Sequence, residues 1–329
     1  MKIVTYSKNV FVPLTTVCSN NCAYCHFKEP LPQADIISLT DLNSILKEAK
    51  QAGCKEVLFT CGSQPEEIPG FTEKLRRETG FTEWIDFVVA ACQEVLKEGL
   101  LPHSNIGVVA PSKLAKLAPY NASMGLMLET TADVKAHANS PTKSFAERRD
   151  FIAAAGELKI PFTSGLLLGI GESKQDRIDS LKELKKLSQQ YGHIQEVILQ
   201  PVDPPKNSQL EEPKSEVVLE TLDLARHILP ESIALQVPPN LVDLGRLLTA
   251  PVDDLGGISS LTPDYINPEH QWPKIKELKD KFADIKFKER LAIYPQYLNQ
   301  EWVQEAVWDC LQSEGWINEY KTRRDTNKS

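Results

Sequence analysis

The chain has 329 residues, a net charge of −8, and apolar and charged fractions of 41% and 25%. This composition is typical of a globular protein with a buried core, and the acidic excess argues against a nucleic acid partner, which would need a basic face. No stretch reaches the roughly 20 apolar residues of a membrane span, and the polar start of the chain does not resemble a signal peptide. We therefore expect a cytoplasmic protein with no nucleic acid or membrane partner.

Eight short apolar or β-branched runs are the predicted strands. In chain order they cover residues 10–16, 56–60, 105–109, 122–128, 162–168, 196–200, 232–237 and 252–258. A near-continuous apolar run, as from Gly165 to Leu168, is typical of a parallel strand buried on both faces. Helical periods lie between the strands, for example in residues 84–95, 173–191 and 213–229.

The order of these elements predicts the fold class. Strand and helix alternate over about 250 residues, which is the length and order of an α/β protein of the (β/α)8 TIM-barrel type. An open doubly wound sheet has the same alternation and is the alternative. We predict a barrel domain in residues 1–284 and a C-terminal extension in residues 285–329. The extension should contain a short helix near residues 300–312 and a disordered polar tail, residues 321–329.

Three of the seven cysteines fall within eight residues, in the motif Cys18-Ser-Asn-Asn-Cys22-Ala-Tyr-Cys25. The motif directly follows the first predicted strand, so it belongs at the end of the barrel where barrel enzymes place their chemistry. Three thiolates can bind three irons of a [4Fe–4S] cluster and leave the fourth iron open. A structural zinc site would need a fourth ligand, and His26 is adjacent to Cys25, where two residues rarely bind one ion. The motif therefore predicts one cluster held by these three cysteines.

This arrangement resembles the radical S-adenosylmethionine (SAM) superfamily, in which SAM chelates the open iron. The resemblance implies that Tyr24 packs on the SAM adenine and that Gly62 lies in the loop that holds the methionyl amine. It implies that Glu129 bonds the SAM ribose. Gly165 and Gly169 match the glycines of the family pattern G-x-[IL]-x-G-x-x-E, which approach adenosine closely. The cluster and SAM are thus the expected cofactors.

Longer stretches are similar to one family within that superfamily. The clearest is Asn121-Ala-Ser-Met-Gly-Leu-Met-Leu-Glu-Thr-Thr131, and others lie at residues 5–11, 155–163, 192–197, 237–241, 254–259 and 262–269. They resemble the CofG-type subunit of 7,8-didemethyl-8-hydroxy-5-deazariboflavin synthase, over residues 3–273. Three features depart from that family. Residues 200–206 replace an Asn-Phe-Arg-like stretch, Leu255 stands where Trp is expected, and Pro251 stands where Gly is expected.

The resemblance implies a reaction in the biosynthesis of coenzyme F420. A partner subunit of the CofH type would join a tyrosine-derived hydroxybenzyl unit to 5-amino-6-(D-ribitylamino)uracil. This chain would abstract a hydrogen atom from that adduct, and oxidation, ring closure and loss of ammonia would give the deazaflavin. Two alternatives are a biotin synthase-like or menaquinone-pathway radical SAM enzyme acting on another small molecule, and a non-catalytic zinc-binding scaffold protein.

Polar side chains at predicted strand ends are the candidates for binding this hydroxyl-rich adduct, namely His103, Asn105, Gln200, Gln236 and Asn240. Asp253 and Asp254 are the candidate catalytic residues, because a carboxylate pair at the barrel mouth can take protons. A solvated turn or a salt bridge to Arg246 is the alternative for this pair. Both lie near the start of the eighth predicted strand, and a later start would leave them at the other end of the barrel.

Overall fold

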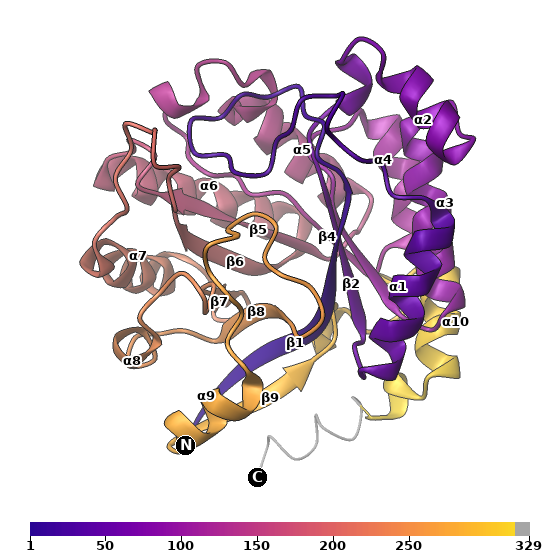
Figure 1. Cartoon of the computed structure of the whole chain (residues 1–329). Coiled ribbons are helices and arrows are strands. Elements are labelled where there is room, and N and C mark those ends of the chain that lie inside the picture. Colours follow the sequence, from indigo (N-terminus) through magenta and orange to yellow (C-terminus); the bar gives the residue numbers. More distant parts are fainter. Residues whose placement is uncertain (320–329) are drawn as a thin grey trace.

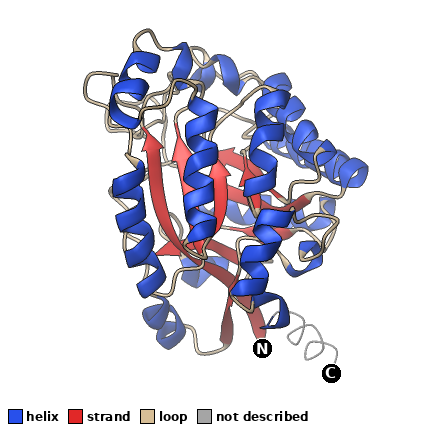
Figure 2. Cartoon of the chain, turned by 90° about the vertical axis from the view of Figure 1, so that its right-hand side faces the viewer, coloured by secondary structure: helices blue, strands red, loops and turns tan. Residues whose placement is uncertain are grey.

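Eight parallel strands close into a ring in the computed structural model, which describes residues 1–319 (Figure 1). Strand β1 pairs with β2 on one edge and with β8 on the other, which closes the ring. The helices lie outside the strands (Figure 2). The predicted (β/α)8 barrel is therefore confirmed. The predicted tail, residues 321–329, lies outside the described residues.

The elements alternate along the chain as the sequence predicts. The strands are β1 (Lys2–Thr15), β2 (Glu56–Cys61), β3 (Leu101–Asn105), β4 (Ser123–Gly125), β5 (Phe162–Leu168), β6 (Ile194–Pro201), β7 (Ala234–Gln236), β8 (Asp254–Ser259) and β9 (Ile285–Arg290). The helices are α1 (Leu39–Gln51), α2 (Phe71–Thr79), α3 (Trp84–Lys97), α4 (Pro111–Leu117), α5 (Phe145–Glu157), α6 (Lys174–Tyr191), α7 (Ser215–Ile228), α8 (Leu244–Leu247), α9 (Ile275–Lys281) and α10 (Glu305–Ser313). Within residues 1–319, none of these helices is long and apolar enough to span a bilayer.

Helix α6 shows how local sequence sets an element's limits. Ser173 and Asp176 form a capping box at its start, which satisfies backbone N–H groups that have no partner inside the helix. Gly192 ends it in the left-handed conformation, with φ of 70°, where a side chain would be strained. Leu181 and Leu184 face the barrel and are fully buried. The apolar period predicted this buried face, and the caps fix where the helix begins and ends.

The third strand differs from the prediction. Strand β3 covers Leu101–Asn105 rather than residues 105–109, and pairs with β2 from Leu101 to Asn105. Gly107 has φ of 74°, and this left-handed conformation ends the extended backbone before the apolar residues that suggested a strand. As a consequence, His103 lies inside the strand, and Asn105 lies at its carboxyl end.

The C-terminal extension contains a strand as well as helices. Strand β9 pairs with residues 2–7 of β1, and the chain then runs across the amino ends of the barrel strands. There Ser123 donates a hydrogen bond to the carbonyl of Ala292 at 2.8 Å. An apolar cluster joins Leu101 to Val307 and Leu311 of α10. The extension therefore covers the end of the barrel opposite the predicted site.

Candidate active site

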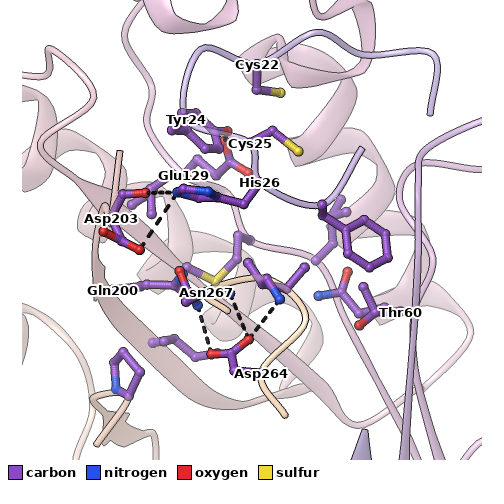
Figure 3. A pocket seen from close by; sticks show the side chains of 18 of the residues that line it. Cys22, Tyr24, Cys25, His26, Thr60, Glu129, Gln200, Asp203, Asp264 and Asn267 are labelled. Carbon is purple, nitrogen blue, oxygen red and sulfur yellow. Dashed lines mark hydrogen bonds and ion pairs between the residues drawn. The ribbon is translucent and has the colours of Figure 1, made fainter. Parts of the chain in front are cut away.

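A cavity of about 330 Å³ opens at the carboxyl ends of the strands. Its wall includes all three motif cysteines together with polar side chains contributed by several strands or the loops after them. Figure 3 shows two of these cysteines, Cys22 and Cys25, near Tyr24 and His26. The lining residues used below are Cys18, Cys22, Tyr24, Cys25, His26, Gly62, Asn105, Glu129, Lys143, Arg148, Gln200, Asp203, Gln236 and Asp264. Residues more than 240 positions apart in the sequence, such as Cys18 and Asp264, thus meet in one pocket.

Each motif cysteine carries a hydrogen bond to its sulfur. The backbone N–H of Ser63 donates to Cys18 at 3.2 Å, and the hydroxyl of Ser140 donates to Cys22 at 3.2 Å. The third cysteine, Cys25, accepts from the N–H of Lys28 at 3.4 Å. Such donors stabilise negative charge on a ligating thiolate. In residues 1–319 no three His, Cys, Asp or Glu side chains surround a single point as one ion would require.

Gly62 explains how the loop after β2 fits against the cysteine loop. A Cβ atom at this position would lie 1.9 Å from the carbonyl oxygen of Val17 and 2.5 Å from the Cβ of Cys18. Both contacts are far inside van der Waals distance, and the first is to rigid backbone. Only glycine therefore allows the two loops to meet at the pocket.

Glu129 lies at the centre of a charged cluster beside Tyr24. The Tyr24 hydroxyl donates to its carboxylate at 2.6 Å, and Lys143 forms an ion pair with it. Arg148 lies 3.3 Å and His137 2.9 Å from the same carboxylate. Burial alone would raise the pKa of Glu129, but these cationic and hydrogen-bonding neighbours hold it well below its usual value. Glu129 is thus an ionised acceptor in the pocket wall.

Gly165 and Gly169 act through their backbone. The carbonyl of Gly165 accepts from the N–H of Glu129 at 2.9 Å, so β5 supports the residue that carries the acidic side chain. The N–H of Gly169 donates to the carboxylate of Glu172 at 3.1 Å. The last residue of the glycine pattern therefore holds the loop after β5 in place.

The five predicted substrate residues divide into two groups. Asn105, Gln200 and Gln236 line the cavity. His103 is instead hydrogen-bonded to Ser123 inside the barrel, at 2.7 Å, and burial lowers its pKa to about 3, so it is neutral. Asn240 donates to Asp264 at 2.9 Å and joins the loop after β7 to the loop after β8.

Asp253 and Asp254 lie at the amino end of β8 and away from the cysteines. The strand begins at Asp254, later than predicted, so both side chains lie toward the end of the barrel opposite the pocket. Asp254 is buried and accepts from Arg290 at 2.6 and 2.8 Å. Asp253 pairs with Arg226 at 3.1 Å, whereas the expected partner Arg246 pairs with Glu216. The structure thus places this carboxylate pair in ion pairs beneath the pocket.

Several lining residues were not singled out by the sequence analysis. Lys143 and Arg148 reach Glu129 from residues before and within α5, and Asp203 follows β6 within the segment that departs from the family. Nothing in the local sequence around these residues distinguishes them from surface charges. For Asp203, the position just after the end of β6 was the only available signal, and Lys143 and Arg148 offered none.

Comparisons with known sequences and structures identify similar proteins. A sequence profile described as the radical SAM superfamily matches residues 12–184. A 7,8-didemethyl-8-hydroxy-5-deazariboflavin synthase of Methanosphaerula palustris is 47% identical over 314 residues, 94% of this chain and 96% of its own. One from Archaeoglobus fulgidus is 44% identical over 312 residues, 93% of this chain and 95% of its own. The structure of methylornithine synthase (PylB) is similar with a TM-score of 0.62 at 18% identity, over 87% of this chain and 84% of that one.

The barrel, the cysteine motif at its mouth and the profile match together define a protein of the radical SAM class. The relatives identify the family within that class, because they match this protein over more than nine-tenths of both chains. The chain belongs to the 7,8-didemethyl-8-hydroxy-5-deazariboflavin synthase family.

Proposed function

We propose that this protein is the radical SAM enzyme that converts a hydroxybenzyl–ribitylaminouracil adduct into 7,8-didemethyl-8-hydroxy-5-deazariboflavin. The observation that carries the proposal is one cavity in which three cysteines, an ionised carboxylate and neutral amide side chains meet. The family membership supports the same reaction. A second synthase subunit of the same superfamily would supply the adduct.

Cys18, Cys22 and Cys25 would hold a [4Fe–4S] cluster. The donor set fits, because three thiols from one loop line the cavity and each sulfur accepts a hydrogen bond. When bound, the cluster and SAM supply a carbon-centred radical that removes a hydrogen atom from the substrate. The protein encloses this chemistry at the barrel mouth, which limits access of water to it.

The SAM contacts follow from the groups beside the cysteines. Glu129 would accept hydrogen bonds from the ribose hydroxyls, and its neighbouring cations keep it in the ionised form that this role needs. Tyr24 would pack against adenine, since it lies between the cysteines and Glu129 (Figure 3). The Gly62 loop would bind the methionyl amine, and the backbone at Gly165 and Gly169 would support the adenosine side.

The substrate contacts would come from the opposite wall. Asn105, Gln200 and Gln236 line the cavity from β3, β6 and β7. An amide side chain both donates and accepts hydrogen bonds, so it suits the uracil edge and the ribityl hydroxyls alike. His103 and Asn240 would act indirectly, by supporting β3 and the loop after β7.

Anaerobic reconstitution followed by product identification tests the proposal. Wild-type protein should bind one cluster and, with reductant, SAM and adduct, release 5′-deoxyadenosine and a fluorescent deazaflavin. Cys18→Ala should abolish iron binding and product, whereas Cys92→Ala should keep both, because Cys92 is buried in the core at α3. SAM cleavage without deazaflavin from authentic adduct would retain the radical SAM class and refute the substrate. Full iron content in the Cys18 variant would refute the cluster site.

A further inference from the structure

Three carboxylates line the cavity among residues 1–319: Glu129, Asp203 and Asp264. Loss of ammonia in the proposed reaction requires proton transfer, so one of them is a candidate acid–base group. Glu129 is held ionised by Lys143 and its other neighbours, which makes it a poor proton donor. Asp264 accepts from two backbone N–H groups and from the amides of Asn240 and Asn267, so both its oxygens are occupied.

Asp203 differs from both. Its Oδ2 atom is buried and has no hydrogen-bond partner within the described part of the chain. The Nε2 atom of His270 lies 3.4 Å from that oxygen, and Nε2 of His26 lies 3.8 Å from it. His26 also hydrogen-bonds the backbone carbonyl of Asp203 at 3.0 Å, which holds the loop against the cysteine loop (Figure 3). A buried oxygen without a partner is costly unless a ligand supplies one.

We propose that Asp203 and His270 are the acid–base pair for the loss of ammonia, which rests on the proposed function. Asp203 donates a proton to the leaving amine through Oδ2. His270, which approaches the same oxygen from the loop after β8, exchanges that proton with Asp203. His26 positions the Asp203 backbone.

The step balances without an oxidant. The carbon–nitrogen bond breaks, and its electron pair stays on nitrogen, which gains one proton to leave as ammonia. A neighbouring substrate atom loses one proton as a double bond forms. The Asp203–His270 pair supplies the proton that nitrogen gains and takes up the proton that the neighbouring atom loses. The pair therefore ends in the protonation state in which it began.

Single-turnover assays on the reconstituted enzyme separate this role from hydrogen abstraction. The variants are Asp203→Asn, His270→Gln and the control Asp223→Asn, whose side chain is exposed on α7. We expect Asp203→Asn to release 5′-deoxyadenosine within about twofold of wild type and to form ammonia and deazaflavin at least about 100-fold more slowly, as for loss of a general acid–base group. A product that retains the amine should accumulate in step with 5′-deoxyadenosine. His270→Gln should likewise form ammonia and deazaflavin at least about 10-fold more slowly, with 5′-deoxyadenosine release close to that of wild type. Asp223→Asn should match wild type in all of these rates.

Two results for the Asp203→Asn variant would overturn the assignment. One is wild-type ammonia release by Asp203→Asn. The other is a parallel loss of 5′-deoxyadenosine and ammonia in that variant at full iron content, which would indicate a role before the elimination. If Asp203→Asn fails to bind the cluster, normal ammonia release by His270→Gln overturns the pair. Failure of the proposed function is distinguishable, because the wild type itself would then give no deazaflavin.

Discussion

Arg290 lies beneath the active-site cavity, and its removal tests how the barrel tolerates buried charge. The residue is 6% exposed, and its side chain donates to Asp254 at 2.6 and 2.8 Å and to Glu196 at 2.9 Å. Arg290→Met keeps the apolar stem and deletes the guanidinium. Both carboxylates then lose their buried cation.

The structure allows the size of the effect to be worked out. Deleting one partner of a buried ion pair costs about 3–5 kcal/mol, because a charge is left uncompensated. Asp254 keeps hydrogen bonds from Thr5 and the N–H of Gly256. Glu196 keeps one from Tyr294 at 3.0 Å and can bind a proton, since burial raises its pKa to about 8. We therefore expect the lower part of the range, about 3 kcal/mol, which leaves a protein of ordinary stability folded.

Urea unfolding of anaerobic protein, followed by circular dichroism, measures this loss. Arg246→Met is the matched control, because Arg246 pairs with Glu216 where both side chains are about half exposed or more, at 49% and 65%. The urea concentration at the unfolding midpoint should be clearly lower for Arg290→Met than for the wild type. For Arg246→Met it should equal the wild-type value. Adding Asp254→Asn to Arg290→Met should restore part of the loss. Equal midpoints for the two single variants would refute the reasoning.

Three further predictions concern single positions. Burial raises the pKa of Glu196 to about 8, above its value in the unfolded chain. The stability that protonated Glu196 contributes is therefore full at acidic pH and is lost as pH rises through about 8. In the wild type the free energy of unfolding should fall between about pH 5 and 9, and Glu196→Gln should flatten that fall. Gly62→Ala should abolish cluster binding, because its Cβ would clash with the carbonyl of Val17, whereas iron content should be unchanged in Gly245→Ala, where the nearest atom is 3.2 Å away. Glu129→Gln should weaken SAM binding by about 1.5–3 kcal/mol, the scale of a hydrogen bond to a charged group, and an unchanged affinity in a binding titration would remove Glu129 from the SAM site.

The sequence alone predicted the class of the protein well. The alternation of strands and helices predicted a parallel sheet, since parallel strands buried on both faces need apolar runs and crossover helices. The pairing of β1 with both β2 and β8 decided that this sheet closes into a barrel rather than staying open. The cysteine spacing and its place after β1 predicted the site, because the carboxyl ends of barrel strands form one mouth. Asn105, Gln200 and Gln236 reached the cavity for the same reason.

Tertiary structure alone decided the residues whose role depends on register or on distant partners. Asp253 and Asp254 lie at the amino end of the barrel strands rather than at the predicted mouth, because β8 starts two residues later than its apolar pattern suggested. Arg290 lies inside the barrel because β9 pairs with β1, although the paired residues are more than 280 positions apart in the sequence. Asp203 lies beside His270 because the loops after β6 and β8 converge over the pocket. Local sequence reports propensity and period, whereas ion pairs and cavities arise between segments that only the closed barrel brings together.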